Sequence, residues 1–122
     1  METPVQITFR HMETSPALEE VIRKKIEKLD ALYDRITGCH VLIEAPHRHH
    51  QQGKHFHVRF DIVVPGTEIV VNRDPGLRSS HEDVHVALKE AFEAAKRQLQ
   101  EYVRKTRGEV KIRSQAQEVV GG

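Results

Sequence analysis

The sequence is poor in the residues that several classes of protein require. Cys39 is the only cysteine, so no internal disulfide can form, and a reducing compartment is the expected environment. There is no tryptophan, and no run of hydrophobic residues approaches the ~18 apolar positions of a membrane span. A glycine-rich phosphate loop is also missing, so we expect no nucleotide cofactor.

The bulk composition is that of one small soluble domain. The chain has 122 residues, of which 38% are hydrophobic and 30% charged. Its first residues, Met1 to Pro4, have neither the basic nor the apolar stretch of a signal peptide, so we expect a cytoplasmic protein. The net charge is only +1, yet basic residues gather at 23–28 and 96–113. A nearly neutral chain with this distribution can carry a basic surface.

Four segments have the pattern of β-strands. Apolar and polar residues alternate over 5–9 and, most clearly, over 56–63, the period of a half-buried strand. Residues 39–45 form another apolar segment, and Pro65-Gly66 predicts a tight turn into a strand at 67–72. The polar segment His47 to Lys54 between them is predicted to be a loop.

Two segments have the 3.6-residue period of amphipathic helices. Ser15 and Pro16 are typical of a helix start, and an apolar stripe follows to Tyr33, so a helix should end near Arg35 to Gly38. The second helix should begin at a capping box of Ser80 and Asp83 and run to about Thr106. The predicted order β-α-β-β-β-α is that of an α+β fold: a two-layer sandwich with a four-stranded sheet and both helices on one face.

This order and several local motifs resemble the ribosome hibernation-promoting factor and ribosome-associated inhibitor family, in its short form. The similarity covers roughly residues 5 to 107. The motifs that carry it are Ile7-Thr8, Thr14-Ser15-Pro16-Ala17-Leu18, Lys28-Leu29, Tyr33-Asp34-Arg35-Ile36, His81-Glu82-Asp83-Val84, Ala87 and Arg97-Gln98-Leu99.

The resemblance implies a protein that binds the small ribosomal subunit and its rRNA in the decoding channel. There it would block mRNA and tRNA sterically and inhibit translation during stress or stationary phase. Residues 1–107 would be the ribosome-binding domain and 108–122 a flexible tail. The family uses basic residues of both helices on rRNA, which here implies Arg23, Lys24, Lys28, Lys89, Lys96, Arg97, Arg104 and Lys105. Such a protein is not an enzyme and needs no cofactor, metal, membrane or small-molecule substrate.

The open face of the sheet is a second candidate surface for RNA. Strand alternation puts His57, Arg59 and Asp61 on one face, with Arg10 expected nearby. A polar platform of this kind can contact RNA phosphates and 2′-hydroxyls without reading sequence. Arg10, His57 and Arg59 are therefore candidate contacts. The aromatic residues fall on core positions, so base stacking is not expected to drive binding.

Two alternatives remain open from the residues alone. The segment His81-Glu82-Asp83-Val84-His85 matches H-E-x-x-H, the pattern of zinc hydrolases, although no third ligand stands out. A layered α+β domain with basic helices is also compatible with a general double-stranded RNA binder. The histidines at 47–57 are candidates for metal binding or for cations that form as the pH falls toward ~6.5.

Overall fold

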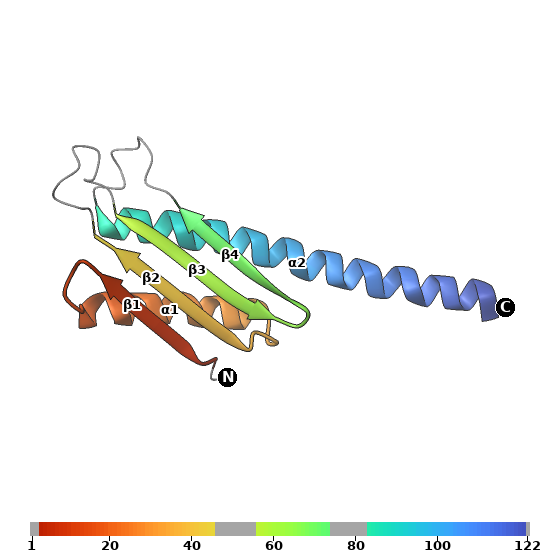
Figure 1. Cartoon of the computed structure of the whole chain (residues 1–122). Helices are drawn as coiled ribbons and strands as arrows, with labels where there is room; N and C mark the ends of the chain where they lie inside the picture. Colours follow the sequence, from red (N-terminus) through yellow and green to blue (C-terminus); the bar gives the residue numbers. More distant parts are fainter. Residues whose placement is uncertain (1–2, 46–55, 74–82, 122) are drawn as a thin grey trace.

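The computed structural model describes residues 3–45, 56–73 and 83–121, with side chains up to Gly108 and excluding that of Arg73. The elements follow in the order β1 (Val5–Arg10), α1 (Pro16–Leu32), β2 (Gly38–Glu44), β3 (His57–Val64), β4 (Thr67–Arg73) and α2 (Val84–Gly121). Both helices lie on one face of the sheet, behind it in the view of Figure 1. The predicted α+β sandwich is confirmed.

The sheet has the strand order β1-β2-β3-β4. β1 runs parallel to β2 because α1 connects them, whereas β2, β3 and β4 are antiparallel neighbours. The register aligns the apolar residues of each strand: Val41 pairs with Ile7 on one side and Phe60 on the other. This alignment puts every second residue into the core with the helices and leaves the other residues on an open face.

α1 begins as its sequence predicts and ends earlier. The Ser15 hydroxyl accepts a hydrogen bond from the Leu18 amide at 3.2 Å, with Pro16 in the first turn. The predicted end near Arg35 to Gly38 is wrong, because Tyr33 already has extended backbone angles, φ −152° and ψ 119°. Leaving the helix there lets the Tyr33 ring pack edge-on against Tyr102, with ring centroids 5.6 Å apart.

α2 differs from the prediction at both ends. It begins at Val84, and the Asp83 carboxylate accepts a hydrogen bond from the His85 amide at 2.8 Å, so Asp83 rather than Ser80 is the cap. Ser80 lies outside the described residues. The predicted end near Thr106 is also wrong, because the helix passes through Gly108 to Gly121 and projects beyond the sheet (Figure 1). The division into a domain and a flexible tail stays a prediction.

The core lies between the sheet and the two helices. α1 contributes Leu18, Ile22, Ile26 and Leu29, α2 contributes residues from Ala87 to Val103, and the strands contribute Val41, Phe60 and their neighbours. The hydroxyl of Tyr102 donates a 2.8 Å hydrogen bond to the Pro65 carbonyl, which ties α2 to the turn between β3 and β4. No helix within the described ranges is long and apolar enough to cross a membrane.

Candidate nucleic-acid interface

The outward side of the helix layer brings cations of α1 and α2 together. Lys25 is half-buried between the helices, with its ammonium 4.9 Å from the centre of the Phe92 ring. Burial lowers the pKa of Lys25 below its usual value, and the nearby charges of Lys28 and Lys89 lower it further, against an opposing effect of Glu93. The ammonium groups of Lys28 and Lys89, one from each helix, therefore lie close enough to repel that of Lys25.

Two depressions lie farther along the pair of helices, at the end of α1. Leu32, Val103, Arg104 and Arg107 help to line a depression of about 660 Å³. Leu32 and Arg107 also line a neighbouring depression of about 500 Å³ with residues of the following turn, including Tyr33 and Arg35. We call the whole feature the interhelical groove, bounded by Lys25, Lys28, Leu32, Arg35, Lys89, Arg104 and Arg107. At ~1.5 Å per helical residue, Lys89 and Arg107 lie roughly 27 Å apart along α2.

The cations of α2 have few carboxylates to neutralise them. From residue 96 to residue 107 this helix has five basic residues and one acid, Glu101. Helical spacing would let Glu101 pair with Arg104 or Lys105, and Glu93 with Arg97. Between the described side chains none of these ion pairs is formed; on α1 an exposed pair joins Lys24 and Glu20 at 3.7 Å. Arg97, Arg104 and Lys105 therefore remain available for an external anion.

The predicted rRNA-binding residues do not all face this groove. Lys28 and Lys89 lie at it, Arg104 lines its wall, and Lys96 lies seven residues, or two turns, from Lys89 on the same side of α2. Arg97 is exposed on the row of α2 that leads to Arg104, and Lys24 is exposed on the outer side of α1.

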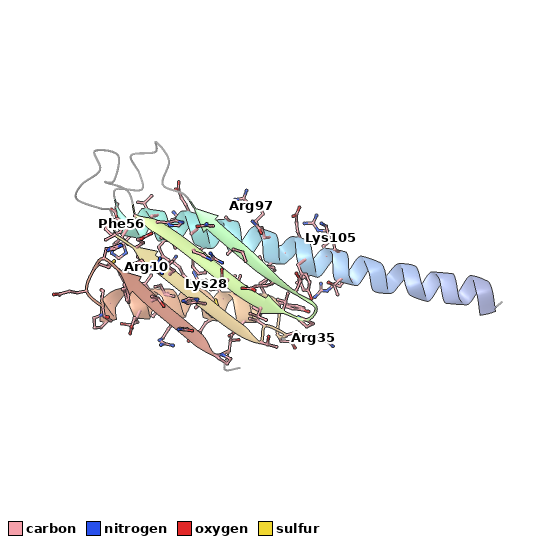
Figure 2. All side chains as sticks on the ribbon, viewed as in Figure 1. Arg10, Lys28, Arg35, Phe56, Arg97 and Lys105 are labelled. Carbon is pink, nitrogen blue, oxygen red and sulfur yellow. The ribbon has the colours of Figure 1, made fainter. Side chains whose placement is uncertain are left out.

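Arg23 and Lys105 lie on the outer flanks of the helices. Arg23 precedes Asp30 by two turns, and the Asp30 carboxylate accepts a hydrogen bond from Thr3 before β1, so this flank faces β1 rather than α2. Lys105 lies two residues before Arg107, which lines the groove, and residues two apart point to opposite sides of a helix. Figure 2 labels Lys28, Arg97 and Lys105 on the helix layer.

Lys25, Arg35 and Arg107 are groove residues that the site prediction omitted. Lys25 had a detectable signal, because it follows the buried Ile22 by three residues and precedes the buried Leu29 by four. That spacing places it at the edge of the apolar stripe, where a neighbouring helix packs. Arg35 and Arg107 had no such signal, because only the crossing of α1 and α2 brings them together.

The open sheet face holds the three other candidate contacts, and two of them, Arg59 and His57, already have polar partners within the protein. The Arg59 guanidinium donates a 2.8 Å hydrogen bond to Asp61, which raises the pKa of Arg59. One ring nitrogen of His57 lies 3.4 Å from a Glu44 oxygen, and the other contacts the Asn72 side chain. Arg10 is exposed at the end of β1 and is labelled in Figure 2.

Of the three zinc-hydrolase candidates, His81, Glu82 and His85, the structure describes only His85. His85 is exposed in the first turn of α2, and Asp83 caps that helix, while His81 and Glu82 lie outside the described residues. Over the ranges that are described, no three histidine, cysteine, aspartate or glutamate side chains are grouped to hold a metal. The histidines of the predicted loop, His47 to His55, also lie outside the description.

Comparison with known proteins decides the family. The family model described as "Sigma 54 modulation protein / S30EA ribosomal protein" matches residues 5–107. The chain belongs to this family. Two Pseudomonas putida proteins named ribosome hibernation promoting factor are each 24% identical over 101 residues, which cover 83% of this chain and 87% of theirs.

Solved structures share the fold. A ribosomal subunit interface protein from Coxiella burnetii has a TM-score of 0.67 at 20% identity, covering 84% of this chain and 99% of that one. The N-terminal domain of Protein Y from Thermus thermophilus has a TM-score of 0.65 at 18% identity, covering 83% and 99%. At these identities the likeness concerns the arrangement of the elements.

Proposed function

We propose that this protein is a ribosome hibernation factor that binds the small ribosomal subunit at the mRNA and tRNA decoding channel. The interhelical groove would contact rRNA phosphates, and the body of the domain would exclude mRNA and tRNA. Inhibition by this route is steric and needs no catalytic group. Cys39, the one cysteine, is buried, and burial raises its pKa to about 12, so it is no nucleophile at neutral pH.

The observation that carries this proposal is the convergence of Lys25, Lys28 and Lys89 from two helices. A free protein gains nothing from placing like charges together, and here the charges of Lys28 and Lys89 help to lower the pKa of Lys25. A phosphate placed among them would remove this repulsion and form charge-assisted hydrogen bonds. The names of the relatives, ribosome hibernation promoting factor and ribosomal subunit interface protein, supply the ribosome as the RNA partner.

Sedimentation with separated ribosomal subunits tests the proposal. Purified protein should pellet saturably with the small subunit, and mRNA together with tRNA should displace it. Binding should weaken steeply with salt, by about 0.7 to 0.9 in logarithmic slope for each phosphate contacted. Pelleting that mRNA and tRNA do not reduce would contradict occlusion of the decoding channel, and no pelleting at low salt would contradict the proposal as a whole.

Arbitrary RNA duplexes provide the necessary comparison. A factor shaped for one rRNA surface should bind the small subunit far more tightly than a random duplex of similar length at the same salt. Comparable affinity for both would instead indicate a general double-stranded RNA binder. Both measurements need the same buffer, because salt alone changes such affinities by orders of magnitude.

A further inference from the structure

The backbone N–H and C=O groups along β4 point alternately toward β3 and away from it, and the register shows which residues point outward. The Val63 carbonyl accepts from the Thr37 amide at 2.9 Å on the β2 side, so the backbone groups of Val63 point toward β2 and those of Val64 point toward β4. Val64 pairs with Thr67, and pairing groups alternate along an antiparallel strand. The N–H and C=O groups of Glu68, Val70 and Asn72 therefore point outward.

Nothing in the described part of the chain pairs with these outward groups through the backbone. β4 is seven residues long and has neither lysine nor proline in its interior, the residues that commonly prevent pairing between sheet edges. Its residues Ile69, Val70 and Val71 are β-branched, which favours the extended conformation. This edge can accept a further strand without a change in the fold.

Exposed valines lie beside the same edge. Val63 and Val70 are 40% and 41% exposed, and they are the large hydrophobic side chains exposed among the described residues. Val63 pairs with Glu68, so Val70, two residues further along β4, is its diagonal neighbour on the open face. The opposite edge, β1, has no such pair, because Val5, Ile7 and Phe9 are partly buried against the core.

We infer that a second copy of this chain docks on β4, antiparallel, with a two-fold axis at Val70. In this register Val70 faces Val70 of the second copy, Glu68 faces Asn72, and Ile69 faces Val71. The backbone groups of residues 68, 70 and 72 all point outward. Each facing pair among them can therefore exchange N–H to C=O hydrogen bonds between the two copies. No pair in it sets two like charges opposite each other, and the Val63 and Val70 side chains of both copies adjoin.

The inferred dimer is a weak one that leaves the helix layer free. A single strand pair with a few valines buries less than the ~1,000 Å² of a stable interface, so dimers should form only at high protein concentration. A two-fold axis perpendicular to the sheet continues it to eight strands and keeps both helix layers on one face. The dimer would therefore present two interhelical grooves on the same side.

Disulfide trapping tests the register. Facing residues in a hydrogen-bonded pair have Cα atoms ~5.5 Å apart, within the range of a disulfide. The variant Val70→Cys should therefore form a covalent dimer under mild oxidation. Glu68→Cys alone should not, because its two copies would be four residues, or roughly 13 Å, apart along the strands. The native Cys39 is buried and needs no replacement.

Mixing single-cysteine variants provides the matched control. Glu68→Cys mixed with Asn72→Cys should give covalent heterodimers, whereas each alone should give almost none. Equal trapping of residues 68, 70 and 72 by themselves would indicate random collision and overturn the register. No trapping of Val70→Cys at high concentration, with the folded state verified by circular dichroism, would overturn the inference itself.

The variant Val70→Lys separates this inference from ribosome binding. A lysine on each copy at the two-fold axis should remove the dimer seen by sedimentation equilibrium, and the exposed position should tolerate the change. Binding of small subunits by the monomer should stay within about twofold, because β4 lies away from the interhelical groove. A dimer that survives Val70→Lys unchanged would overturn the proposed contact, whatever the subunit measurements give.

Discussion

The interhelical groove and the open face of the sheet both carry charged side chains, but they differ in how those charges are satisfied. On the sheet, Arg59 is paired with Asp61, and His57 lies between Glu44 and Asn72. In the groove, the charges that act on Lys25 are those of Lys28, Glu93 and Lys89, and Asp34 lines the neighbouring depression together with Arg35 and Arg107. Arg59 and His57 on the sheet face thus have polar partners within the protein, while the groove holds more cations than carboxylates.

This difference shows why a count of basic residues is a poor guide to an RNA surface. A cation already paired with a carboxylate must break that pair before it can bind a phosphate, and it gains correspondingly little. A cation held near others of its own sign gains twice, from the phosphate and from the relief of repulsion. We therefore expect variants of the groove to affect subunit binding far more than variants of the sheet face.

The largest effect is expected from reversing one cation on each wall of the groove. Lys28→Glu combined with Lys89→Glu should weaken small-subunit binding about 100-fold or more, because two phosphate contacts become repulsive. The salt dependence should also become shallower. Subunit pelleting at several salt concentrations measures both quantities, and an unchanged thermal melt shows that the fold is intact.

The outer flanks of the same helices provide the matched control. Arg23→Glu combined with Lys105→Glu makes the same change in net charge, one residue per helix, at positions that face away from the groove. Its effect should be below about tenfold at low salt and should largely vanish at physiological salt, where screening acts over ~8 Å. Equal losses for the two double variants would mean that net charge, rather than the groove, determines binding.

Replacing Lys25 should have a smaller effect, and it should change stability and subunit binding in different directions. Lys25→Met removes an ammonium whose pKa is lowered by burial and by Lys28, so the melting temperature should stay constant or rise by about 1–3 °C. Subunit binding should fall roughly fivefold, since one phosphate partner is lost. Melting and pelleting of the same preparation test both signs, and a loss of stability would show that the contact with Phe92 outweighs the repulsion.

The sheet face should give the smallest change in binding. Arg59→Gln leaves the Asp61 carboxylate, whose side chain is 15% exposed, without its ion pair, so a small loss of stability is expected. Subunit binding should change less than about twofold. A binding loss as large as that of Lys25→Met would show that the sheet face belongs to the interface and would end the contrast between the two surfaces.

Local sequence pattern predicts much of the fold, and the two wrongly predicted helix ends have different causes. Local pattern located all four strands to within about one residue: alternation predicts β1 and β3, an apolar segment predicts β2, and the Pro65-Gly66 turn predicts β4. The end of α1 was misplaced because Tyr33 leaves the helix to meet Tyr102, a contact that no local pattern encodes. The end of α2 was misplaced because one glycine, Gly108, costs a helix only ~1 kcal/mol, and no proline follows to stop it.

The candidate site was predictable only in part, because it depends on how the two helices pack together. Helical period shows that Lys28 and Lys89 lie off the apolar stripes, but it does not say which flank of each helix faces the other. That depends on how α1 and α2 pack over the sheet, which separates Lys28 from Arg23 and Arg107 from Lys105. The family resemblance implies basic residues on both helices and does not say which flank of each helix carries them.

The buried thiol of Cys39 can report on both surfaces without belonging to either. Its side chain lies on the core face of β2, 5% exposed, and burial raises its pKa to about 12. At pH 8 the thiolate fraction is then about 10⁻⁴, against roughly a quarter for a free thiol of pKa ~8.5, so alkylation should be very slow in the folded protein and fast in denaturant. Alkylation that requires unfolding should slow further when small subunits bind, because binding stabilises the folded state. The double variant Lys28→Glu with Lys89→Glu should abolish that extra protection.

Arg59→Gln should act differently. Because it weakens the fold and spares the groove, it should speed alkylation in the free protein and keep the protection by subunits.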